Sequence, residues 1–110
     1  MWDETLKKIE DRLRLSSTLG EPQRAELLRL MQDLKSEVQS LADSDPDHAH
    51  SIASFADLST HEATRGERQP ALLQHAVGGL SSSVTGFEQA HPKLTEAVNR
   101  LAILLSNMGV

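Results

Sequence analysis

Apolar residues recur along this chain at alternating steps of four and three, the spacing that places them on one face of an α-helix. The first stripe predicts a helix over residues 3–17, and Gly20 is expected to end it in the left-handed conformation that glycine adopts easily. The second stripe predicts a helix over residues 22–42. Because only a short Gly/Pro turn separates the two, residues 1–43 are expected to form an antiparallel helical hairpin.

The middle of the chain, residues 44–69, is polar and rich in His and Ser. Asp45 is a favourable N-cap and Pro46 a favourable first residue, so a third helix is expected to begin there. Its apolar stripe is thin and consists of Ile52, Phe55, Ala56 and Leu58.

Residues 70–110 are expected to form a pair of helices broken at His91-Pro92, because a residue that precedes proline disfavours the α conformation. The first of the pair should run from about residue 70 to Phe87. Its second half contains no charged residue and many Gly and Ser. This composition indicates either a marginal helix held by its neighbours or a face of small residues that packs against another helix.

The apolar stripe of the last helix ends at Leu105 and Met108. Gly109 and Val110 then have the spacing of a Schellman cap, in which Val110 would contact Leu105.

Composition supports an all-α fold in one domain. The chain has 110 residues, three aromatic side chains and an interior that must be built mainly from leucine, which favours helices over sheets. No Cys is present, no signal-peptide pattern opens the sequence, and no apolar run is long enough to span a membrane, so we expect a cytoplasmic protein. The formal charge of −5 and the lack of Lys/Arg clusters argue against nucleic-acid and anionic-lipid partners.

Three segments resemble a known family. FEQAHPKLT from Phe87, Asn99-Arg100 and LSNMGV from Leu105 are similar to the closing signature of the bacterial domain-of-unknown-function 4404 family. ELLRLMQDLK from Glu26 is similar to its N-terminal helix. The resemblance implies a short, cytoplasmic, mostly helical protein. It implies no catalytic residues or cofactor, because the family has no assigned activity.

Histidine supplies the only candidates for site chemistry. His50, Asp57 and His61 would lie on one face of the third helix, where imidazole and carboxylate groups can share a divalent metal. Surface residues of a polar helix explain the same pattern without a metal. His91 is expected to cap or pack the corner before the last helix rather than to act as an acid or base. No nucleophile elbow or phosphate-binding loop occurs, so we expect no enzyme activity.

The apolar stripes favour a non-catalytic oligomerisation or scaffold module, with a homodimer or higher homo-oligomer as the expected state. Two alternatives remain: a metal- or small-ligand-binding helical domain that uses the histidines, and an adaptor whose Gly/Ser-rich face receives a partner helix. The residues expected in helix–helix contacts are Leu27, Met31, Leu34, Val38, Leu73, Val77, Leu80 and Val84.

Overall fold

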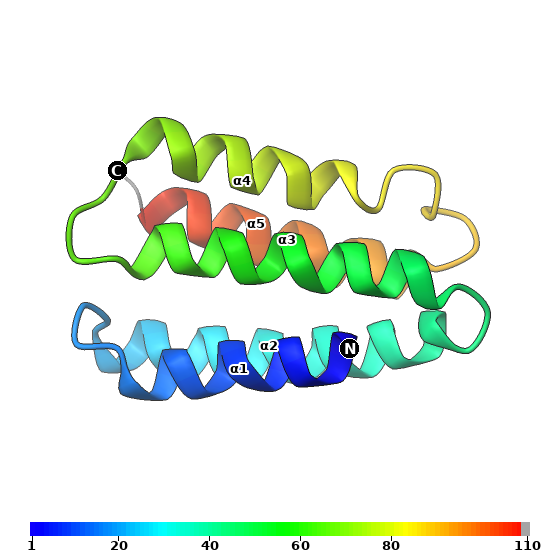
Figure 1. Cartoon of the computed structure of the whole chain (residues 1–110), viewed down its shortest axis with the longest axis horizontal. Helices are drawn as coiled ribbons and strands as arrows, with labels where there is room; N and C mark the ends of the chain where they lie inside the picture. The colour runs from blue at the N-terminus through cyan, green and yellow to red at the C-terminus, as the bar shows by residue number, and fades with distance from the viewer. Residues whose placement is uncertain (109–110) are drawn as a thin grey trace.

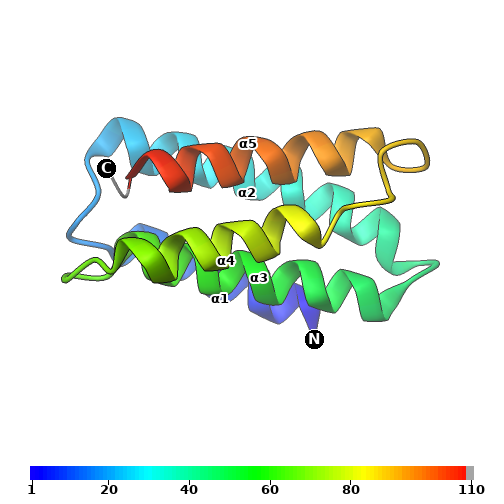
Figure 2. The ribbon, with the colours of Figure 1, turned by 90° about the horizontal axis from the view of Figure 1, so that it is seen from above.

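Five helices form the protein in a computed structural model that describes residues 1–108. They are α1 (Trp2–Leu15), α2 (Glu21–Ala42), α3 (Pro46–Thr64), α4 (Pro70–Ser82) and α5 (Pro92–Met108). No strand occurs in this range, so the expected all-α class is confirmed. Each connection reverses the direction of the chain, and the helices lie side by side along the long axis of a body measuring 37 × 24 × 22 Å (Figures 1 and 2).

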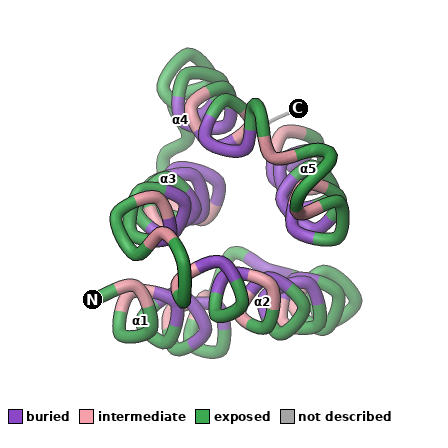
Figure 3. Tube along the Cα trace, turned by 90° about the vertical axis from the view of Figure 1, so that its right-hand side faces the viewer, coloured by how far each residue is buried: buried purple, intermediate pink, exposed green. Residues whose placement is uncertain are grey.

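Helix α3 is the centre of the bundle, because it contacts all four other helices. On one side of it lies the predicted α1/α2 hairpin, and on the other lie α4 and α5 (Figures 1 and 3). Helix α5 also packs against α2, which closes the bundle. The buried surfaces of the five helices face this common interior (Figure 3).

Small side chains allow α3 to occupy this position. Its buried residues include alanines, Ser59 and Thr60, and Ile52 is its one large buried aliphatic residue. The prediction that Phe55 and Leu58 belong to the buried stripe is wrong, because both are exposed. Only the alanine side of α3 lets four neighbours approach closely, which leaves the bulky side chains outside.

Helix α1 ends without the predicted glycine cap. Gly20 has a φ of −74° and is the N-cap of α2 rather than the C′ residue of α1. The guanidinium of Arg24 instead reaches across the turn and donates to the carbonyl oxygens of Leu13 and Ser16, the former at 3.0 Å. These bonds satisfy groups at the end of α1 that have no partner within the helix.

The N-terminus of α3 is confirmed as predicted. Asp45 is the N-cap, its carboxylate accepts a 3.0 Å hydrogen bond from the backbone N–H of His48, and Pro46 is the first helical residue. The negative charge at this position also complements the helix dipole.

Helix α4 is shorter than predicted, since it ends at Ser82 and not near Phe87. The hydroxyl of Ser83 donates to the carbonyl oxygen of Leu80 at 2.6 Å, and Gly86 turns the chain with a φ of +94°. Such a φ is strained for most other residues. Helix α5 begins at Pro92 as predicted, whereas the predicted cap at Gly109 and Val110 lies outside the described residues.

Candidate functional site

The eight residues predicted in helix–helix contacts all lie in the hydrophobic core of the single chain. Even the most exposed of them, Val77, shows only 8% of its surface. A second copy can contact only side chains that the folded chain exposes. Any association between folded copies must therefore use surfaces other than these stripes.

The outer side of α3 and α4 carries three large apolar side chains in contact with solvent. Phe55 is 37% exposed, Leu58 47% and Leu72 49%. Phe55 and Leu58 are three residues apart on α3, and Leu72 and Gly79 are seven apart on α4, so each pair shares a helix face. The Phe55 ring lies directly over Gly79, where an added Cβ atom would collide with the ring. We call Phe55, Leu58, Leu72 and Gly79 the α3–α4 face.

Helix α4 contains no Asp, Glu, Lys or Arg, in a chain of which these residues make up 25%. Gly78 and Ser82 are exposed, as a docking face of small residues requires, but the Phe55 ring covers Gly79. The small-residue surface is therefore only partly open.

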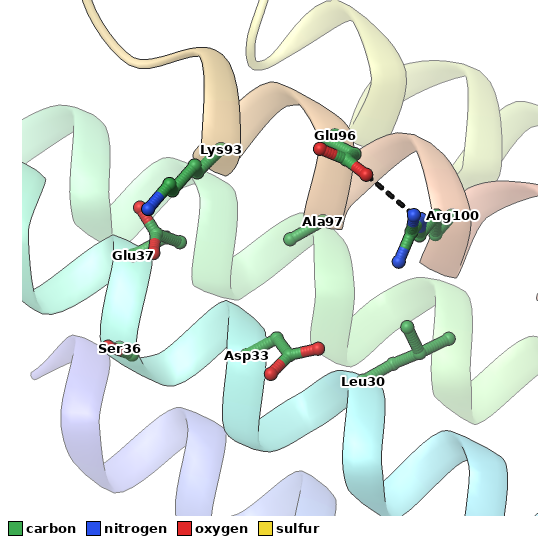
Figure 4. Close-up of a pocket in the computed structure, with 8 residues that line it drawn as sticks. All are labelled: Leu30, Asp33, Ser36, Glu37, Lys93, Glu96, Ala97 and Arg100. Carbon is green, nitrogen blue, oxygen red and sulfur yellow. Dashed lines mark ion pairs between the residues drawn. The ribbon is translucent and has the colours of Figure 1, made fainter.

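A groove follows the opposite side of the molecule, between α2 and α5. One end holds about 240 Å³ and is lined by charged residues, including Asp33 and Glu37 from α2 and Lys93 and Arg100 from α5 (Figure 4). Arg100 forms a 2.6 Å ion pair with Glu96, its neighbour one turn earlier.

The other end of this groove is more apolar and holds about 400 Å³. Leu30 and Arg100 line both ends, so the two spaces adjoin each other. Ile103 stands at the apolar end with 62% of its surface exposed, beside half-buried Leu104. We call the whole depression the α2–α5 groove.

The candidate metal residues His50, Asp57 and His61 are not brought together. Asp57 faces α1, where its carboxylate forms ion pairs with Arg12 at 2.7 Å and with Lys8 at 3.4 Å. Among the residues that the structure describes, no group of three His, Asp or Glu side chains is placed to hold a metal ion. Within residues 1–108, no helix combines the length and apolar character that crossing a bilayer requires.

The corner between α4 and α5 encloses Phe87. Its ring centroid lies 4.5 Å from that of His48 and 5.9 Å from that of His91. His48 Nε2 is 2.5 Å from the carbonyl oxygen of Ser83, so this nitrogen donates and joins the start of α3 to the end of α4. His91 accordingly packs in the corner, in a position that fits the packing role expected for it.

Comparison with models of protein families shows which family the chain belongs to. The model described as "Domain of unknown function (DUF4404)" matches residues 3–110, nearly the whole chain. The chain belongs to the DUF4404 family. Searches among curated proteins and among solved structures gave no match. In this DUF4404 chain, the part of the resemblance from Phe87 to Met108 falls on the α4–α5 corner and on α5, which are parts of the helical scaffold.

Two surfaces of this DUF4404 protein were missed by sequence reasoning. The α3–α4 face was missed because the apolar pattern assigned Phe55 and Leu58 to the core. The α2–α5 groove depends on the pairing of two helices that are far apart in the chain. The run without charge in α4 was the one sequence signal that pointed to the first surface.

Proposed function

We propose that this DUF4404 protein is a cytoplasmic, non-catalytic module that associates with a second copy of itself through the α3–α4 face. The observation that carries the proposal is the exposure of Phe55, Leu58 and Leu72 on a surface whose α4 side is free of charge. A partner that covers these side chains removes apolar area from water, which is the main driving force for association.

The distribution of charge makes the α3–α4 face better suited to contact with a second copy than the other surfaces of the chain. The chain carries a formal charge of −5, so two copies repel one another over most of their surface. In a two-fold dimer each patch faces the same patch of its partner. A surface whose α4 side has no charged residue brings few like charges together, whereas the charged helices α1, α2 and α5 would bring many.

The size of the face predicts a weak dimer. The 13 residues of α4 make a helix about 20 Å long, and two adjacent helices are roughly 20 Å wide. The resulting area of about 400 Å² per copy is smaller than the ~800 Å² per partner of a standard interface. We therefore expect an equilibrium between monomer and dimer that depends on protein concentration.

Sedimentation velocity over a range of protein concentrations tests this proposal. The wild-type protein should shift from monomer towards dimer as concentration rises. The double variant Leu58→Glu/Leu72→Glu should remain monomeric, because each new carboxylate would face its symmetry-related copy or nearby apolar surface. Circular dichroism should show unchanged helix content, since both side chains are about half exposed.

The matched control is Ile103→Glu, which places the same charge at an exposed apolar residue of α5. It should dimerise like the wild type. A wild-type protein that is monomeric at every concentration, or a dimer that only Ile103→Glu disrupts, contradicts the proposal.

A further inference from the structure

The α2–α5 groove has the features of a site for a helical segment. It is bounded by two long antiparallel helices, has one charged end and one apolar end, and is open to solvent along its length. Leu30 and Ala97 are buried between its walls. A groove of this kind between helices is a surface into which an amphipathic helix can lay its apolar side.

The charged residues of the groove favour a cationic partner. Across both ends, the lining contains one more carboxylate than cations. The cation of Arg100 is already paired with Glu96, and Asp33 and Glu37 form no ion pair within the described part of the chain. Figure 4 shows the Asp33 carboxylate on α2, apart from the Lys93 and Arg100 side chains, with Lys93 beside Glu37. The middle of the groove is therefore open to an added cation.

The spacing between the charged and apolar ends defines the partner further. The charged end centres near Asp33–Glu37 and the apolar end near Glu26–Leu30, about seven residues away along α2. Seven residues of helix cover roughly 10 Å. A bound helix would therefore place a basic residue at one position and an aliphatic residue seven positions away on the same face.

From these features we infer that the α2–α5 groove binds a cationic amphipathic helix of another protein. A Lys or Arg of the partner pairs with Asp33, and an aliphatic side chain seven residues away packs against Ile103, Leu104 and Leu30. The negative net charge of the chain attracts such a partner over longer distances.

Two synthetic peptides test the inference. Each is an alanine-based helix of about 18 residues, long enough to be helical in water. The cationic peptide carries Lys at two positions one turn apart and Leu seven residues after each, and the acidic peptide carries Glu in place of Lys. In fluorescence anisotropy, the cationic peptide should bind saturably and the acidic peptide should not.

Variants of the groove should weaken this binding. Asp33→Lys/Glu37→Lys should reduce the affinity for the cationic peptide by roughly tenfold or more, because attraction becomes repulsion. The control is Glu67→Lys, a charge reversal at an exposed residue of the α3–α4 linker. It is compared with the single variant Asp33→Lys, because both change the net charge by the same amount. Glu67→Lys should change the affinity by less than about twofold at physiological salt.

A matched pair of variants tests the apolar end of the groove. Ile103→Ser should weaken binding of the cationic peptide, whereas Leu15→Ser, at an exposed leucine at the end of α1, should not. In two-dimensional NMR, the peptide should shift the amide signals of α2 and α5. Absence of saturable binding, equal losses with Glu67→Lys and Asp33→Lys, or signal changes on α3 and α4 instead would each overturn the inference.

The two interactions can be tested separately. The Leu58→Glu/Leu72→Glu variant should bind the cationic peptide as the wild type does, and Asp33→Lys should leave the monomer–dimer equilibrium in place. A protein that binds the peptide but stays monomeric would refute only the proposed self-association.

Discussion

At the scale of single residues, two hydroxyl groups buried in α3 differ in their bonding. Thr60 Oγ1 donates to the carbonyl oxygen of Ala56 at 2.8 Å. Ser59 is fully buried, and its Oγ has no hydrogen-bond partner among the described residues. A buried polar atom without a partner costs about 1–3 kcal/mol of stability. Ser59 is therefore a weak point of the core.

Ser59→Ala is expected to raise the free energy of unfolding by about 1 kcal/mol, because it removes the unpaired hydroxyl and favours the helix. Urea unfolding followed by circular dichroism measures the change. Ser54→Ala is the control: Ser54 is exposed on the same helix, and its hydroxyl donates to the carbonyl oxygen of His50. Both variants gain the same helix propensity, so the larger gain at Ser59 reports burial. A loss of stability in Ser59→Ala would show that its hydroxyl has a partner in solution.

At the scale of elements, α1 is joined to the central helix by one partly buried polar contact. The carboxylate of Asp57 on α3 forms ion pairs with Arg12 and Lys8 of α1, and Arg12 also donates to the backbone oxygen of Asp57 at 3.3 Å. The Arg12 side chain is mostly buried, whereas that of Lys8 is mostly exposed. Exposed ion pairs contribute little because water and salt screen them. The two contacts should thus differ in strength although they share one carboxylate.

Arg12→Met is expected to lower the free energy of unfolding by about 1–2 kcal/mol, because it removes two hydrogen bonds to a partly buried group. Lys8→Met should change it by less than about 0.5 kcal/mol. Methionine keeps much of the aliphatic length in both cases. Chemical unfolding of the two variants under the same conditions makes the comparison, and equal effects would contradict the assigned roles.

The helices themselves were largely predictable from the sequence, and their ends were not. Long stripes of apolar residues specify α1, α2 and α5 because a helix buries one face, and Pro46 and Pro92 mark starts that the structure confirms. The end of α1 depends on Arg24, which comes from the next helix, and the end of α4 depends on a side-chain bond of Ser83. Such contacts leave no periodic signal in the sequence.

The candidate surfaces were harder to predict than the helices. The apolar pattern of the sequence predicted that Phe55 and Leu58 are buried. Apart from Ile52 and Glu62, however, the buried side of α3 is made of Ala, Ser and Thr, which have weak apolar character. The α2–α5 groove requires knowing that Asp33 and Lys93 come together, although sixty positions separate them. Both surfaces are determined by which helices pack together in the folded protein.

At the scale of the whole molecule, one continuous core holds the bundle together. Leu34 of α2 and Leu80 of α4 are both fully buried within it, although their helices are not neighbours in the bundle. Stability of a domain this size is only about 5–15 kcal/mol, so one badly placed charge can remove most of it. Core leucines and surface leucines should therefore respond very differently to the same substitution.

Leu34→Glu or Leu80→Glu is expected to unfold the protein, because a buried carboxylate without a partner costs several kcal/mol. Leu58→Glu, at a half-exposed leucine, should keep the wild-type circular dichroism spectrum and a cooperative thermal transition. Wild-type stability in either core variant would mean that the bundle does not bury these side chains in solution.

The central position of α3 bears on how the chain folds as it leaves the ribosome. Helices α1, α2 and α3 all contact one another, so the N-terminal part of the nascent chain can collapse before synthesis is complete. The side of α2 that receives α5 stays uncovered until the last helix emerges, because α5 is the final segment of the described chain. That side is sealed only when α5 has been synthesised and has docked, and until then it is open to a molecular chaperone.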